Sequence, residues 1–289
     1  MAVLTLPAVA KLNLFLHIIG QRDDGYHRLE TLFQFIDYGD TLTFTPQPER
    51  TLTFTCSQAQ FATADNLVLQ AARLLQHRFP THWRGVHVHL DKRLPAGGGL
   101  GGGSSDAATT LLALRHLWQL PLSTAELATL GLSLGADIPV FIHGRAAFAT
   151  GIGEILTPAT PPCPWYLVVH PGVTVATPTV FKHPDLPRQT LPLQDWTQWQ
   201  WETTRNDCEQ LVSQLHPEVA NALAWLLEYA PPRLTGTGAC VFARFDSEEP
   251  AQQALQALPD KWQGFVAQGL NENPVCQHLR QASTVNLPD

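Results

Sequence analysis

The segment from residue 97 to residue 103 restricts most strongly what this chain can fold into, because six of its seven residues are glycine. Glycine accepts positive φ angles and lets backbone N–H groups approach a ligand closely. The alternating residues 86–90 before the segment predict a strand, and the apolar stripe Ala107, Leu111, Leu114 and Trp118 after it predicts a helix. Unpaired N–H groups and the helix dipole favour an anion at such a helix start. The sequence therefore predicts a phosphate-binding loop between a strand and a helix.

The pattern of the loop differs from two common nucleotide-binding motifs. No segment matches the P-loop pattern G-x-x-x-x-G-K-[ST]. The series Gly99-x-Gly101-x-x-Ser104 has serine where the dinucleotide fingerprint needs its third glycine. A flexible linker is the simpler alternative, but linkers rarely join a strand directly to a strongly amphipathic helix. We expect Ser104 or Ser105 to cap the helix.

Composition and charge limit the class of protein. The chain has 289 residues, of which 44% are hydrophobic and 15% charged, so two domains with buried cores are expected. Its net charge of -7 gives no general attraction to nucleic acid or anionic lipid. Its five cysteines are odd in number and lack a C-x-x-C pair, which favours a reducing compartment. With no sequence signal for a signal peptide or a membrane span, we expect a cytoplasmic protein, with no nucleic-acid, membrane or protein partner implied.

Strand and helix signals are mixed with uneven spacing, which predicts an α+β fold. The two alternating segments 41–45 and 51–55 are expected to pair as a hairpin through the turn at 47–50. Four prolines in residues 157–164 predict a boundary between domains of residues 1–156 and 157–289. The other expected elements are strands at about 12–19, 165–169 and 240–245, and helices at about 66–78 (capped by Asp65), 123–133, from 137 onward, 218–229 and 248–257.

The segment Pro95–Ala108, P-A-G-G-G-L-G-G-G-S-S-D-A-A, resembles the central motif of the GHMP kinases. Four further segments resemble motifs of that family, although Val9 stands where the family usually has proline. In family order they are A-K-L-N-L at 10–14, D-G-Y-H at 24–27, G-A-D-I-P-V-F at 135–141 and R-L-T-G-T-G-A-C at 233–240. The residues 205–209 also match a family stretch without a chemical role that we can name. The resemblance implies a two-domain GHMP kinase fold, with a ribosomal-protein-S5-like N-terminal domain and a ferredoxin-like C-terminal domain.

The resemblance further implies an ATP-dependent kinase that uses Mg²⁺. The loop would hold the phosphates of ATP, and Ser104 is the candidate metal ligand. The metal would otherwise be held by phosphate and water, because the sequence shows no strong acidic cluster. The residues expected to bind ATP are Pro95, Ala96, Gly97, Gly98, Gly99, Leu100, Gly101, Gly102, Gly103, Ser104, Ser105, Asn66 and Lys92.

Two residues are implied to be catalytic. In the resembling family the aspartate at the position of Asp137 accepts the proton of the attacking hydroxyl, and the lysine at the position of Lys11 lies close to it. From the residues alone, Asp137 is more simply a helix N-cap and Lys11 a surface lysine on an edge strand. The third loop, residues 235–239, is expected either to close on the nucleotide site or to steady the glycine loop.

The acceptor-binding residues resemble one branch of the family, whose substrate is a cytidine diphosphate-linked methylerythritol. Tyr26, His27 and Phe181 would hold its cytosine, because aromatic rings stack on a base and an imidazole can hydrogen-bond a base edge. Asn13 and Thr177 complete this expected substrate-binding set. The alternatives are a GHMP kinase of the homoserine or mevalonate type, which needs no base-binding rings, and a non-catalytic nucleotide-binding regulator, which would lack Asp137 or Lys11.

Overall fold

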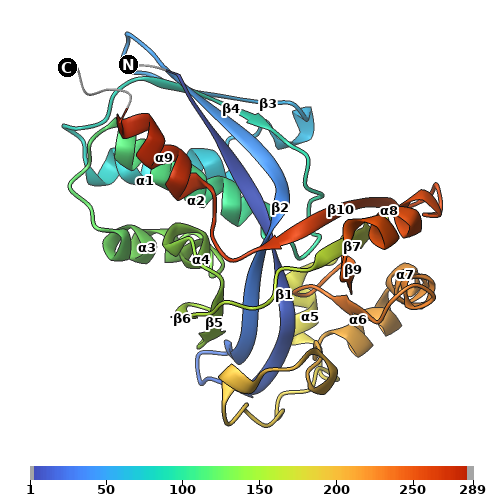
Figure 1. Ribbon diagram of the computed structural model, residues 1–289. Helices are drawn as coiled ribbons and strands as arrows, with labels where there is room; N and C mark the ends of the chain where they lie inside the picture. Colours follow the sequence, from blue (N-terminus) through green and yellow to red (C-terminus); the bar gives the residue numbers. More distant parts are fainter. Residues whose placement is uncertain (1–2, 285–289) are drawn as a thin grey trace.

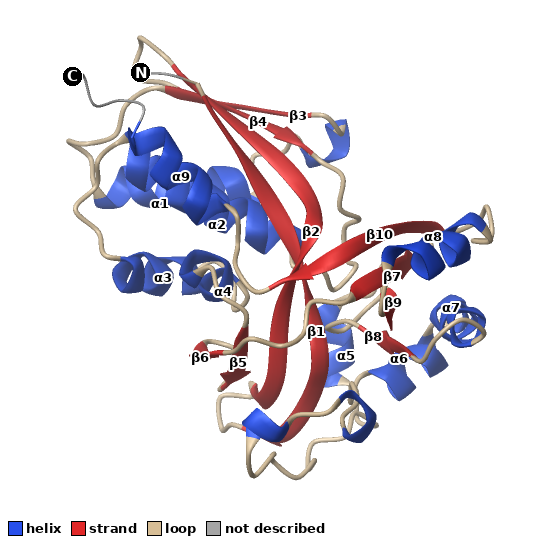
Figure 2. Cartoon of the chain, viewed as in Figure 1, coloured by secondary structure: helices blue, strands red, loops and turns tan. Residues whose placement is uncertain are grey.

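Figure 1 shows the computed structural model of the chain, which describes residues 3–284. Helices and strands alternate irregularly along the chain, which confirms the predicted α+β class (Figure 2). The strands are β1 (Leu4–Gln21), β2 (His27–Pro46), β3 (Leu52–Cys56), β4 (Val86–Asp91), β5 (Ala147–Thr150), β6 (Ile155–Pro158), β7 (Trp165–His170), β8 (Pro232–Leu234), β9 (Val241–Phe245) and β10 (Gln263–Leu270). The α-helices are α1 (Leu67–Arg78), α2 (Gly102–Leu117), α3 (Thr124–Leu132), α4 (Ile138–His143), α5 (Thr177–Lys182), α6 (Glu209–Leu215), α7 (Pro217–Leu227), α8 (Glu248–Gln256) and α9 (Val275–Thr284).

The strands β1 and β2 form a long antiparallel hairpin that passes through both halves of the molecule (Figure 1). Its register runs from Leu4 opposite Phe44 to Gln21 opposite His27, with irregularities after Val9, Asn13 and Ile18. Such irregularities bend a strand and redirect its side chains. The middle of β1 therefore lies where the two halves meet, and it carries Lys11 and Asn13 into the interior.

The expected hairpin between residues 41–45 and 51–55 is wrong. The strand β4 lies between β2 and β3, antiparallel to β2 and parallel to β3. The segment between β2 and β3 bonds to the start of β4: Gln47 N donates to Gly85 O at 2.9 Å, and Val86 N donates to Thr51 O at 2.9 Å. Alternation shows that a segment is a strand, but not which strand lies beside it.

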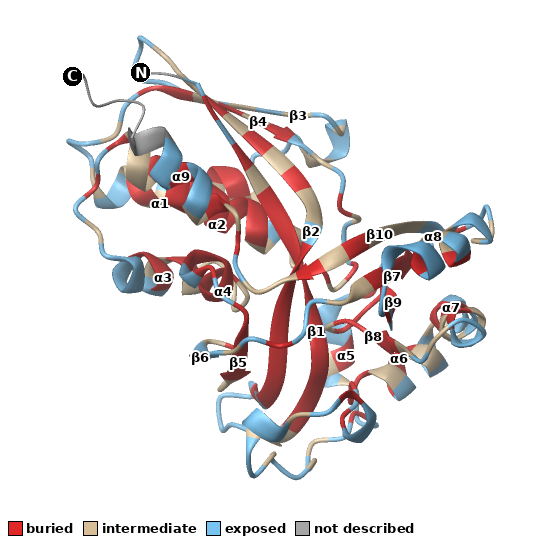
Figure 3. Ribbon diagram, in the orientation of Figure 1, coloured by how far each residue is buried: buried red, intermediate tan, exposed pale blue. Residues whose placement is uncertain are grey.

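Three clusters of buried apolar side chains form the core. The first lies around α1, α2, β2 and β4, and the second around α6, α7 and β9. The third lies between them and includes Leu12, Leu100 and Phe242. Figure 3 shows that α2 and the central hairpin are largely buried.

The C-terminal elements β10 and α9 contact the N-terminal part of the molecule. The helix α9 returns to the first cluster through Val275 and Leu279, and β10 pairs with both β2 and β7. The domain boundary at residues 156 and 157 stays a prediction, and the final helix packs with the N-terminal elements. No described helix has both the length and the apolar character needed to cross a bilayer.

Candidate active site

A pocket of about 570 Å³ opens where the start of α2, the middle of β1 and the starts of α4 and α5 meet. Most of the predicted site residues line it, although they come from segments far apart in the sequence. Those brought together here are Lys11, Asn13, Asn66, Lys92, every residue from Pro95 to Ser104, Asp137, Thr177 and Phe181. Ser105, Tyr26 and His27 are not on its wall.

The glycine loop has the backbone geometry that its composition predicts. Gly97, Gly99 and Gly101 have φ angles of 64°, 73° and 70°, which side-chain-bearing residues rarely adopt. The predicted cap at Ser104 or Ser105 is wrong, because the left-handed Gly101 is the N-cap and α2 begins at Gly102. The first helical hydrogen bond runs from Ser105 N to Gly101 O at 2.8 Å. The N–H groups of residues 102–104 therefore have no acceptor within the helix and can bind an anion.

The two serines of the motif have different environments. Ser104 lines the pocket, and its hydroxyl has no hydrogen-bond partner among residues 3–284. Ser105 is fully buried, and its hydroxyl donates to Val9 O at 2.7 Å. The expectation that Ser105 contacts ATP is therefore wrong for its side chain, because one helical residue turns it by about 100° toward β1.

The third loop steadies the glycine loop. Ala239 N donates to Gly97 O at 3.0 Å and Cys240 N donates to Gly98 O at 3.1 Å. Any side chain at Gly99 would clash with the carbonyl oxygen of Thr235. The Asn206 amide in turn donates to Leu234 O and Gly236 O, both at 2.8 Å, which gives the unassigned segment 205–209 a role in holding this loop.

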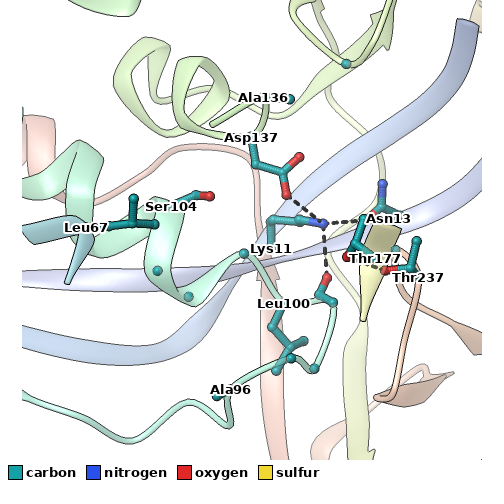
Figure 4. A pocket seen from close by; sticks show the side chains of 18 of the residues that line it. Lys11, Asn13, Leu67, Ala96, Leu100, Ser104, Ala136, Asp137, Thr177 and Thr237 are labelled. Carbon is teal, nitrogen blue, oxygen red and sulfur yellow. Dashed lines mark hydrogen bonds and ion pairs between the residues drawn. The ribbon is translucent and has the colours of Figure 1, made fainter. Parts of the chain in front are cut away.

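Lys11 is at the centre of the polar part of the pocket (Figure 4). Its ammonium lies 2.6 Å from Asn13 Oδ1, 3.0 Å from Gly99 O and 3.3 Å from Asp137 Oδ2. Its side chain is only 3% exposed, so it is not a surface lysine on an edge strand. Asp137 does stand at the N-cap of α4, but its side chain makes no capping hydrogen bond. The carboxylate is 34% exposed and can receive a group from the pocket.

Lys92 belongs to a buried ion cluster that the sequence did not indicate. Its ammonium lies 2.5 Å from Asp40 Oδ2 and 2.9 Å from Asp106 Oδ2. Burial lowers the pKa of Lys92, but the carboxylates of Asp106 and Asp40 raise it by more. Burial and the neighbouring Asp40 raise the pKa of Asp106, although Lys92 opposes them. Asp40 also accepts from Arg93 N and Leu94 N at 2.6 and 2.8 Å, so the cluster fixes the chain that enters the glycine loop.

One end of the pocket lies near α5. Thr177 and Thr237 join their hydroxyls at 2.8 Å, and Phe181 forms part of the wall. The His27 ring is buried and stacks on Phe181, with ring centroids 5.2 Å apart. Tyr26 is 60% exposed and stands outside the pocket. The structure thus places Phe181 and Thr177 on the wall at this end, with His27 off the wall and stacked on Phe181, and leaves Tyr26 at the surface.

Several site residues escaped the sequence analysis. Asp106 lies inside the quoted glycine motif, and Thr237 lies in the third loop. Their positions within these motifs could have indicated that both residues belong to the site. Asp40 carries no such signal, because an acidic residue within a strand usually faces solvent. Among the described residues, no group of three or more His, Cys, Asp or Glu side chains is placed to hold a metal ion.

Comparisons with known proteins agree with this geometry. Residues 66–145 match the model of the GHMP kinases N terminal domain, and residues 191–264 match that of the GHMP kinases C terminal domain. A solved 4-(cytidine 5'-diphospho)-2C-methyl-D-erythritol kinase is 32% identical, with a TM-score of 0.81, covering 92% of this chain and 99% of that one. Mevalonate kinase from Methanococcus jannaschii is 14% identical, with a TM-score of 0.67 and coverages of 93% and 98%. Homoserine kinase from Cytophaga hutchinsonii is 16% identical, with a TM-score of 0.62 and coverages of 94% and 96%. The last two show the fold alone.

Proposed function

The chain belongs to the GHMP kinase family, and from this premise we propose that it phosphorylates the 2-hydroxyl of 4-diphosphocytidyl-2-C-methyl-D-erythritol. The family membership makes the protein an ATP-dependent kinase of a small molecule with the two-domain GHMP fold. The products of the proposed reaction are the 2-phosphate and ADP, and the reaction would serve non-mevalonate isoprenoid precursor synthesis. The observation that carries the specific substrate is the 32% identity to a kinase of that name over 92% of this chain.

In the proposed complex the triphosphate of ATP lies on the glycine loop. Support comes from the unpaired N–H groups at the start of α2, which converge on the pocket with the free hydroxyl of Ser104. Asn66 and Lys92 line the same pocket and are our candidates for the adenosine end. Asn66 caps α1, since its Oδ1 accepts from Val68 N at 2.9 Å, so its position is fixed and the predicted cap at Asp65 is wrong.

The proposed base is Asp137. Its carboxylate faces the pocket beside Lys11, where an acceptor hydroxyl could reach it. It would take the hydroxyl proton as the oxygen attacks the γ-phosphorus, and ADP would leave with the electrons of the broken bond. Lys11 is held by Asn13 and by Gly99 O, so its positive charge is fixed between the carboxylate and the loop. Phosphoryl transfer relies chiefly on such positioning and charge stabilisation.

We also propose that ATP is used with Mg²⁺. The donors present fit a metal held mainly by phosphate and water, because Ser104 offers one free hydroxyl and no group of three or more His, Cys, Asp or Glu side chains among residues 3–284 is placed to hold a metal ion. When bound, Mg²⁺ would neutralise charge on the phosphate oxygens.

The cytidine of the acceptor would lie at the α5 end. His27 and Phe181 form a stacked pair there, next to the hydroxyls of Thr177 and Thr237. A kinase of homoserine or mevalonate has no base to bind at this end. For Tyr26 to cover the base as well, its exposed ring would have to swing over the pocket when the acceptor binds.

A coupled assay of ADP release tests the proposal. The purified protein is given ATP and Mg²⁺ with equal concentrations of the cytidine compound, homoserine or mevalonate. We expect turnover with the cytidine compound alone, and the product to carry its phosphate at the 2-position by phosphorus NMR. A higher kcat/KM for homoserine or mevalonate would overturn the proposed substrate and leave the family membership intact. No ADP release with any acceptor would favour a nucleotide-binding regulator.

A further inference from the structure

Arg188 connects two parts of the acceptor end that come from distant segments. Its Nε donates to His27 Nε2 at 3.0 Å, at the start of β2. Its Nη2 donates to Phe181 O at 3.3 Å and to His183 O at 2.7 Å, at the end of α5. Its Nη1 donates to Pro184 O and Leu186 O at 3.2 and 2.9 Å. All five N–H groups of the guanidinium are therefore used, and one of them reaches a histidine ring.

The contact with His27 determines the protonation of that ring. Arginine has donors and no acceptor, so the Nε2 atom that it contacts must offer a lone pair. A neutral imidazole that accepts at Nε2 carries its proton on Nδ1. Within residues 3–284 no hydrogen-bond partner meets Nδ1. Burial, and then the charge of Arg188, lower the pKa of His27, which agrees with a neutral ring.

The same arginine fixes the distance between the two rings. His27 stacks on Phe181 with an interplanar angle of 28°, and Arg188 is bonded both to the imidazole and to the backbone carbonyl of Phe181. No carboxylate lies within ion-pair distance of Arg188 in the described part of the chain, so its bonds go to carbonyls and the ring. A planar, five-donor group is needed for this arrangement, and a lysine ammonium cannot reproduce it.

We propose that Arg188 is a positioning residue for acceptor recognition: it holds His27 as the Nδ1–H tautomer against Phe181, so that the ring presents a hydrogen-bond donor to the acceptor. The cytosine ring carries acceptors at O2 and N3, which a fixed N–H donor can recognise. This inference rests on the proposed function, because it assigns His27 to the acceptor. Arg188 would act only through His27 and α5 and would not touch the transferred phosphate.

The first test reads the tautomer directly in the free protein. Histidine-labelled wild type is recorded by ¹⁵N NMR at pH 7.5, and His27 is assigned by its loss in His27→Gln. We expect the chemical shifts of a neutral ring protonated at Nδ1. In Arg188→Met we expect the proton to move toward Nε2, because the donor at that atom is gone. A wild-type ring protonated at Nε2 would overturn the proposal, whatever the variants do.

The second test separates acceptor binding from ATP binding. Arg188→Met should raise KM for the cytidine compound by about tenfold or more, as expected for a lost hydrogen bond to a charged group. KM for ATP should change less than about twofold, a difference below 0.5 kcal/mol. Arg188→Lys keeps the charge but loses the planar donors, and it should behave like Arg188→Met. A wild-type KM in Arg188→Lys would show that charge alone matters and would refute positioning.

Arg50 provides a matched control at the other end of the β1/β2 hairpin. It is an exposed arginine that also bonds backbone carbonyls, with Nε donating to Trp83 O at 3.1 Å. Arg50→Met should leave both KM values unchanged, and an equal rise in both KM values for Arg188→Met would indicate general damage and contradict the proposal. If wild type shows the Nδ1–H ring but does not phosphorylate the cytidine compound, the proposed substrate fails, and with it the acceptor role of Arg188. If it phosphorylates that compound with a ring protonated at Nε2, only the inference fails.

Discussion

Lys11 Nζ lies 3.3 Å from Asp137 Oδ2, although one residue comes from the first strand and the other from the start of α4. The ammonium is almost fully buried, and Asn13 Oδ1 and Gly99 O take its other two N–H groups. The pair therefore places a fixed positive charge and a reachable carboxylate at the end of the glycine loop. In the proposed reaction, Asp137 is the proton acceptor and Lys11 the neighbouring cation.

Asp137→Asn should reduce kcat by at least about 10²-fold, which is the usual contribution of a positioned general base. The amide keeps the shape of the side chain but does not accept a proton, so binding of ATP should persist. ADP release gives kcat, and titration with an ATP analogue gives the affinity. Asp260→Asn, which replaces an exposed aspartate of the same chain, is the control and should turn over like wild type. Wild-type turnover in Asp137→Asn would remove Asp137 from the chemistry.

The sequence predicted the chemical features of the site better than the arrangement that produces it. The glycine loop, Lys11, Asn13 and Asp137 stand together in the pocket as their motifs implied. The arrangement itself depends on contacts between distant segments. Strand pairing placed β4 between β2 and β3, and no local pattern distinguishes that order from a hairpin.

Charged residues within strands and loops were the other difficulty. Asp40 and Arg188 look like surface residues in the sequence, because the partners that bury or bind them lie 52 and 161 positions away. A cap prediction failed for a different reason. Gly101 takes a positive φ of 70° and is the N-cap, so α2 begins at Gly102 and Ser104 is already its third residue.

Ser104→Ala and Ser105→Ala should have different consequences, because only the first hydroxyl faces the pocket. Ser104→Ala should raise KM for ATP and leave the free energy of unfolding nearly unchanged. Ser105→Ala should lower the free energy of unfolding by about 1–3 kcal/mol, since it leaves the buried Val9 carbonyl without its donor. Urea unfolding and ATP kinetics measure the two effects. The reverse outcome, with KM for ATP affected only by Ser105→Ala, would contradict the assignment of the serines.

Gly99→Ala should lower both stability and ATP affinity. The residue has a φ of 73°, and its new methyl group would clash with the carbonyl oxygen of Thr235 and displace the third loop. Gly172→Ala is the matched control, because Gly172 has a φ of 81° but its methyl group would meet only Lys261 O at 3.7 Å. Both variants carry the backbone strain of about 1–2 kcal/mol, so the difference between them measures the clash. Thermal unfolding and ATP titration provide the comparison. Equal losses in the two variants would show that the contact with the third loop is unimportant.

Asp106→Asn should gain stability relative to wild type as the pH rises. Burial raises the pKa of Asp106 above its ordinary value of 3.8, and its Oδ1 has no hydrogen-bond partner in the described part of the chain. The folded state therefore holds this proton more tightly than the unfolded chain. Such a group makes the free energy of unfolding fall as the pH rises above the ordinary carboxyl range.

Asparagine cannot ionise, and it leaves Lys92 and Asp40 as a neutral buried pair. The free energy of unfolding is measured in urea at pH 5.5 and at pH 8.5. The value for Asp106→Asn minus the value for wild type should be larger at pH 8.5 than at pH 5.5. If this difference is the same at both pH values, or is smaller at pH 8.5, Asp106 is ionised throughout this range and its charge is stabilised by Lys92.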